Sequence, residues 1–170
     1  MPERTPWGTT MRSFIVLGLL VAGGFAWSTG VCAQEDRTVV LAKSWDAFNG
    51  RKYEEAIKLA GTSVEQFSRQ AARDQQRIQS GSARPLPPGP ADPSSSTAKA
   101  TFANGVLNET AACMFVLASS HERTAQCKEA LEAYKVLSKL THARAWDPRG
   151  WFWAPSDAAL DSIERLKGKC

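Results

Sequence analysis

The stretch WDAFNGRKYEEAIKLAGTSVEQF, residues 45–67, carries the clearest structural pattern in the chain. Its apolar residues recur at steps of three and four and therefore fall on one face of a helix. They are Tyr53, Ala56, Ile57, Ala60, Val64 and Phe67. A shorter apolar stripe precedes them, and Asn49-Gly50 separates the two with residues that accept a left-handed backbone and end a helix. The pattern predicts an antiparallel helical hairpin over residues 34–79, with an end after residue 69 that is frayed or bridges solvent, because apolar residues become sparse there.

A second helical pattern covers residues 106–141. It breaks at Ser119-Ser120-His121, and the return helix is expected to begin near Thr124, a good cap. A last short helix is predicted after Pro155, with four buried apolar residues: Ala159, Leu160, Ile163 and Leu166. No alternating pattern long enough for a strand is present. The predicted fold class is all-α, with two antiparallel helical hairpins and a short C-terminal helix.

A segment rich in proline and serine separates the two hairpins. Residues 80–99 contain five prolines and five serines, a composition that cannot bury a core and favours extended or disordered chain. We therefore predict a linker over residues 80–100. Residues 101–170 hold the second hairpin, a tryptophan-rich segment and the terminal helix, and they are expected to form one domain with residues 34–79.

The N-terminal residues are typical of an export signal. A basic stretch at Met11-Arg12-Ser13 precedes an apolar run of 14 residues, Phe14–Trp27, which is shorter than the ~20 residues of a spanning helix. Val31-Cys32-Ala33 fits the small-x-small cleavage rule. Residues 1–33 are therefore predicted to be a cleavable signal peptide, with translation starting at Met1 or Met11. The protein is expected to be secreted or periplasmic, with no membrane span after cleavage; an uncleaved anchor and a lipidated Cys32 are the alternatives.

Processing after Ala33 gives the first testable prediction. Mass spectrometry of the exported protein is expected to find a chain that begins at Gln34, in its open or cyclised form. An intact N-terminus, or a lipid attached to Cys32, would show that this cleavage site is wrong.

Composition and motif spacing exclude several function classes. The chain has 21 Lys and Arg and 17 Asp and Glu; residues 1–33 hold two of these bases and one acid, so 19 and 16 remain, a net charge of +3. The bases are scattered among acids, which argues against nucleic-acid binding. The two histidines stand alone, no C-x-x-C occurs, and no phosphate-binding loop or nucleophile motif is present. We predict no catalytic residues, no metal and no cofactor.

Three cysteines remain after signal cleavage, and an oxidising compartment favours their pairing. Cys113 and Cys127 lie on the predicted apolar faces of the second hairpin, about eight and six residues from its turn. With a rise of ~1.5 Å per residue, their axial offset is about 3 Å. The expected disulfide joins Cys113 to Cys127. Pairing with Cys170 is the main competitor, and two free thiols are the other alternative.

WDPRGWFW, residues 146–153, is the strongest candidate binding segment. In one interpretation Trp146, Trp151 and Trp153 stack on a sugar ring or a peptide aromatic, while Asp147 and Arg149 supply polar contacts. In the other, favoured for so small a domain, the rings seal the open end of the helix stack. Alternate side chains of an extended segment point in opposite directions, so Phe152 is expected to separate from Trp151 and Trp153.

Residues 45–60 resemble the turn and second helix of a tetratricopeptide repeat. The matching positions are Gly50, Tyr53, Ala56, Ile57 and Ala60. Residues 107–140 resemble a degenerate second repeat, in which Ala130 and Tyr134 match. Leu107-Asn108-Glu109-Thr110, followed by WDPRGWFW, is similar to a group of exported bacterial tetratricopeptide-like proteins, some of them labelled as glucanase-related.

This resemblance implies helical hairpins that bind other proteins. We therefore expect an exported protein-interaction or assembly module without enzymatic activity, whose protein partner the sequence does not name. The alternative is a carbohydrate-binding or glucan-processing accessory protein that binds a glycan through Trp146–Trp153. A glycosidase needs two carboxylates that face each other across a cleft, and nothing in the sequence marks such a pair.

Overall fold

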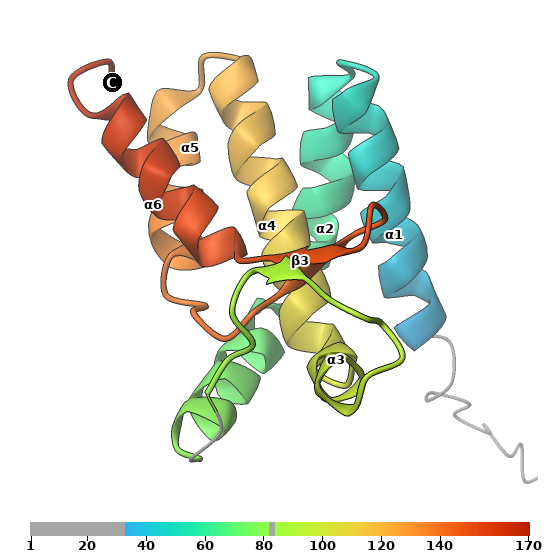
Figure 1. Ribbon diagram of the computed structural model, residues 1–170. Coiled ribbons are helices and arrows are strands. Elements are labelled where there is room, and N and C mark those ends of the chain that lie inside the picture. The colour runs from blue at the N-terminus through green and yellow to red at the C-terminus, as the bar shows by residue number, and fades with distance from the viewer. Residues whose placement is uncertain (1–32, 82–83) are drawn as a thin grey trace, which may run out of the picture. The chain divides into compact units, whose positions relative to one another are not determined.

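The computed structural model describes residues 33–81 and 84–170, with side chains from Arg37 onward (Figure 1). The predicted signal peptide lies outside these residues, apart from the backbone of Ala33. The elements in chain order are α1 (Ala33–Asn49), α2 (Tyr53–Gln79), β1 (Gly89–Pro90), α3 (Ser96–Phe102), α4 (Gly105–Arg123), α5 (Cys127–Leu137), β2 (Ala145–Asp147), β3 (Trp151–Trp153) and α6 (Pro155–Leu166). The chain is therefore mostly helical, as predicted, but it also holds a small sheet that was not predicted. No helix within the described ranges is long and apolar enough to cross a membrane.

The turn between α1 and α2 lies where the sequence predicted it. A Cβ on Gly50 would stand 3.1 Å from the carbonyl oxygen of Asp46, so glycine suits this close approach. Arg51 then takes a φ of 60°, and the chain reverses into α2. Ala56 and Ala60 are fully buried, which allows the backbones of α1, α2 and α4 to pack closely.

Helix α4 lies at the centre of the fold and packs against α1, α2, α5 and α6 (Figure 1). One side of α4 joins a core with α2, α5 and α6, in which Leu107, Ala111, Met114 and Ala118 are buried. Another side joins a second core with α1 and α2, in which Cys113 and Val116 are buried. A helix with two buried faces shows no single apolar stripe, so its sequence pattern does not reveal which neighbour each face contacts.

The C-terminal part of α2 is anchored, and the prediction of a frayed end was wrong. Ala71 is fully buried, and Gln75 is only 5% exposed. The amide of Gln75 donates to Thr141 Oγ1 over 3.0 Å and accepts from the backbone N–H of His142 over 2.9 Å. These polar contacts fix a helix end that has few apolar residues.

The predicted linker, residues 80–100, holds secondary structure in its second half. Strand β1 pairs with β3, with Gly89 opposite Phe152 and Pro90 opposite Trp151. Helix α3 begins at Ser96, after Ser95 accepts a capping hydrogen bond from the backbone N–H of Ala98. Backbone pairing and a helix cap therefore fix the conformation at residues 89–90 and from residue 95 onward, although residues 89–100 hold no large apolar residue.

The cysteine pairing differs from the expected one. A disulfide joins Cys127 to Cys170, with Cα atoms 5.6 Å apart, and the predicted bridge between Cys113 and Cys127 is wrong. Cys113 lies on the side of α4 that faces α1 and α2, where burial raises the pKa of its thiol to about 11. This thiol is protonated at neutral pH and packs as a small apolar group.

Helix α6 packs against α5, and its buried face differs from the prediction at one residue. Ala159 and Leu166 are buried and Ile163 packs against the same core, but Leu160 is 55% exposed and points away from it. The end of α6 and Cys170 return toward the beginning of α5, which brings Cys170 to Cys127. The disulfide therefore fixes the C-terminus onto the second helical pair.

Candidate functional site

The tryptophan-rich segment forms a small antiparallel hairpin at one edge of the helices. Strands β2 and β3 pair with Trp146 opposite Phe152, and β3 is the central strand in the order β1-β3-β2. Phe152 is fully buried, and its ring lies 4.8 Å from Trp146 and 5.0 Å from Phe102, measured between centroids. This face of the hairpin serves packing.

Trp153 packs on the opposite side of β3, as the alternation of an extended segment predicts. Its ring centroid lies 5.1 Å from that of Phe115 on α4 and 6.5 Å from that of Trp45 on α1. In Figure 1, the turn before β3 lies on the α1 side, and β3 runs from there across α4 to α6. Phe152 and Trp153 therefore fasten the hairpin to the helices, and Trp151, 37% exposed, is left as its most accessible ring.

Asp147 and Arg149, the two polar candidates, bind each other across the hairpin turn. Arg149 Nη2 lies 2.8 Å from Asp147 Oδ2, and the backbone N–H and Nε of Arg149 donate to Oδ1 over 2.9 and 3.0 Å. These hydrogen bonds hold the pKa of Asp147 well below its usual range. The carboxylate is therefore ionised and engaged at neutral pH, and it lacks the raised pKa of a glycosidase general acid.

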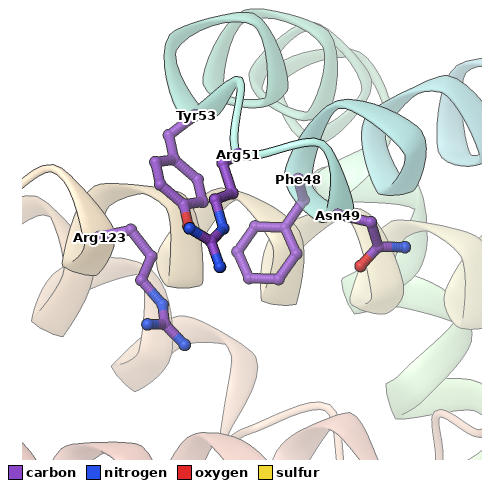
Figure 2. Close-up of a pocket in the computed structure, with 5 residues that line it drawn as sticks. All are labelled: Phe48, Asn49, Arg51, Tyr53 and Arg123. Atoms are coloured by element: carbon purple, nitrogen blue, oxygen red, sulfur yellow. The ribbon is translucent and has the colours of Figure 1, made fainter.

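A pocket of about 560 Å³ lies at the turn between α1 and α2, away from the predicted site residues. We call it the turn pocket, and its lining residues are Phe48, Asn49, Arg51, Tyr53 and Arg123. Figure 2 shows Arg51 beside the rings of Phe48 and Tyr53, while Arg123 extends from the end of α4 toward the same space. The two rings meet edge to face, with centroids 5.8 Å apart.

The turn pocket is positively charged. Among the described residues, neither Arg51 nor Arg123 has a carboxylate oxygen within 4.0 Å. Glu55, near Arg51 in sequence, lies 3.8 Å from Lys52, and Glu122, next to Arg123, is bound by Arg165. The hydrogen bond from Arg165 lowers the pKa of Glu122, as expected for a carboxylate bound by a guanidinium group. Within the part of the chain that the structure describes, neither guanidinium group of the pocket forms an ion pair, although the charge of Arg123 also acts on Glu122.

Sequence reasoning missed this pocket because no motif marks it. Its residues come from two parts of the chain: the turn between α1 and α2 with the residues on either side of it, and the end of α4. These two parts are separated by about 70 positions along the chain. One signal was present: a basic residue stands at the turn of each predicted hairpin, Arg51 in the first and Arg123 in the second. Packing of the two helical pairs side by side then brings both to one surface.

No protein-family model, no curated protein and no solved structure matches this chain. Among the side chains that the structure describes, those of residues 37–81 and 84–170, no three His, Cys, Asp or Glu gather as a metal site would require. The turn pocket combines guanidinium groups and aromatic rings, a set suited to binding an anion beside an apolar group.

Proposed function

We propose that the protein is an exported, non-catalytic interaction module that binds an acidic segment of a partner protein in the turn pocket. The observation that carries this proposal is the presence of Arg51 and Arg123 with two aromatic rings in one pocket, with no described carboxylate oxygen within 4.0 Å of either guanidinium group. A disulfide in the structure agrees with export, because disulfides persist in oxidising compartments.

The helical architecture supports a tetratricopeptide-like module. Gly50 occupies the tight turn, and Ala56 and Ala60, the small residues of the resemblance, are both fully buried between helices. Ala130 and Tyr134, which match in the second pair, are buried as well. Modules of this kind present helix turns and faces to partner proteins.

The chemistry of the turn pocket defines the segment that fits it. A guanidinium group binds a carboxylate through charge-assisted hydrogen bonds, and two such groups favour one or two acidic side chains. The rings of Phe48 and Tyr53 offer an apolar surface to a neighbouring side chain of the ligand. The preferred ligand is therefore a Glu or Asp next to a Leu or Phe in a flexible or terminal segment.

Peptide binding tests this proposal. The full exported protein is titrated with short peptides in which Glu flanks Phe, and with matched peptides in which Gln replaces Glu. Arg51→Ala and Arg123→Ala are each expected to weaken binding of the acidic peptide about tenfold or more, since a hydrogen bond to a charged group contributes roughly 1.5 to 3 kcal/mol. Fluorescence anisotropy of the labelled peptide measures the change.

Arg69→Ala is the matched control, because Arg69 is an exposed arginine of α2 outside the pocket. It is expected to leave the affinity unchanged. Equal affinity for the Glu and Gln peptides, or equal losses in all three variants, would mean that the turn pocket does not recognise acidic segments.

A second function, glycan binding, is favoured by one observation. Trp151 is 37% exposed and lies opposite Asp147 in the strand pairing, so a ring face and a carboxylate stand together on the surface. Against this function, the carboxylate of Asp147 is already hydrogen-bonded by Arg149, and the ring of Trp153 packs on Phe115. Binding of a soluble glucan that Trp151→Ala abolishes, with no loss in Arg51→Ala, would favour the carbohydrate function over the one proposed.

A further inference from the structure

A second pocket, of about 440 Å³, lies between the end of α2, the segment after residue 84, α3 and the residues after α5. We call it the arginine pocket. Basic side chains line it: Arg77, Arg84, His142 and Arg144. Thr101 and Asn104 add polar side chains, and none of the described lining residues is acidic.

Arg144 is the unusual member of this pocket, since it is only 6% exposed. Buried arginines are ordinarily paired with a carboxylate. No described residue forms an ion pair with Arg144; its Nε donates to the carbonyl of Leu86, and its Nη1 donates to the carbonyls of Thr141 and Ala143 over 3.0 and 2.6 Å. Three of its five N–H groups are used, and the two on Nη2 have no partner among the described residues.

The local electrostatics leave this cation uncompensated. Burial lowers the pKa of Arg144, which shows that its charge is partly desolvated, and Asp157 opposes this shift only from beyond ion-pair distance. Burial and the charge of Arg144 lower the pKa of His142, so this imidazole is largely neutral at pH 7. Arg77 extends into solvent, with Asp74 3.6 Å away. The positive charge of the pocket therefore comes from Arg84 and Arg144, and in part from Arg77, which forms an ion pair with Asp74.

We infer that the arginine pocket binds a small oxyanion of the phosphate or sulfate class, held by Arg144 at its base and by Arg77 at its rim. A tetrahedral oxyanion offers several acceptors and can receive the free N–H groups of Arg144 while it bonds to a second guanidinium. The volume of about 440 Å³ also leaves space for a small organic group that carries the anion. This site is separate from the turn pocket and does not depend on the function proposed for it.

Thermal unfolding of the full exported protein tests the site, with inorganic phosphate and sodium sulfate as probes and sodium chloride at equal ionic strength as the reference. A ligand that binds only the folded state raises Tm with its concentration. We expect a saturable rise in Tm with phosphate or sulfate that chloride does not produce. Arg77→Glu is expected to weaken the apparent affinity about tenfold or more, because it replaces an attractive charge by a repulsive one.

Two further variants make the result specific. Arg73→Glu makes the same change of charge as Arg77→Glu, at an exposed position of α2 outside the pocket. It is expected to show the same rise in Tm with phosphate or sulfate as the unmodified protein. Arg144→Lys keeps the positive charge but loses the planar guanidinium group. It is expected to show a smaller rise in Tm with phosphate or sulfate than the unmodified protein, but still a rise. No saturable rise in Tm, or the same response in Arg77→Glu as in the unmodified protein, would overturn the inference. A loss in Arg73→Glu as large as that in Arg77→Glu would overturn it too, because the effect would then be one of overall charge.

Discussion

Replacing Ala56 by glutamate is expected to lower the free energy of unfolding by about 3 to 5 kcal/mol. Ala56 is fully buried where α1, α2 and α4 meet, in the cluster that contains Ala47, Cys113 and Val116. A carboxylate there has to be neutralised or hydrated, and its larger side chain has to push the helices apart. Because small domains are stable by only about 5 to 15 kcal/mol, this loss is a large part of the total stability.

Ala72→Glu provides the matched control, since Ala72 lies on the same helix with its side chain exposed. The same chemical change there is expected to alter stability by no more than about 0.5 kcal/mol. Chemical denaturation monitored by circular dichroism measures both variants. Equal stability of Ala56→Glu and Ala72→Glu would contradict the packing of α2 against α1 and α4.

Removing the disulfide is the second change expected to have a large effect. Cys127 and Cys170 are 43 residues apart in sequence, and closing a loop of that length contributes about 4 kcal/mol in the chain-entropy account of disulfide stability. Cys170→Ser is therefore expected to lower the free energy of unfolding by about this amount under oxidising conditions. The effect arises mainly in the unfolded chain, which regains the freedom that the crosslink removed.

Reducing conditions supply the control for this variant. With the disulfide reduced, the unmodified protein and Cys170→Ser are expected to unfold at nearly the same denaturant concentration. Non-reducing peptide mapping is expected to recover Cys127 linked to Cys170, and Cys113 as an alkylated thiol after denaturation. A peptide that links Cys113 to Cys127 would contradict the pairing seen in the structure.

The disulfide shows where sequence reasoning stops. Helical periodicity placed Cys113 and Cys127 on apolar faces, and both lie on helices as predicted. Because α4 has neighbours on several sides, an apolar position on it can face α2 as well as α5, and Cys113 faces the first helical pair. Helical periodicity predicts that a residue is buried, but the helix that this residue contacts is decided by tertiary packing.

Polar anchoring explains two other differences. Gln75 fixes the end of α2 through Thr141 and His142, which lie 66 and 67 positions away. Asn108 binds the carbonyl of Thr101 through its Nδ2 and the backbone N–H of Arg144 through its Oδ1. Such long-range pairs are not visible in local composition. The sequence therefore predicted less order for the end of α2 and for the region of β1 and α3 than the structure shows.

The candidate sites follow the same rule. The sequence pointed to Trp146–Trp153 because aromatic residues crowd there, and the fold uses Phe152 and Trp153 to attach that segment to the helices. Arg51 and Arg144 carried no comparable signal, since one stands in a turn and the other follows a helix. Their importance comes from what surrounds them, a shared pocket in one case and burial without a described carboxylate in the other.

Amide chemical-shift mapping by NMR tests the central claim, recognition of an acidic segment at the turn pocket. The isotope-labelled exported protein is titrated with the Glu-Phe peptide and, in parallel, with a soluble glucan. We expect the peptide to shift amide resonances around residues 48–53 and 121–125, and Arg51→Ala to remove most of these shifts. Peptide shifts centred on residues 146–153, or shifts there with the glucan alone, would contradict the account and place the binding surface on the tryptophan hairpin.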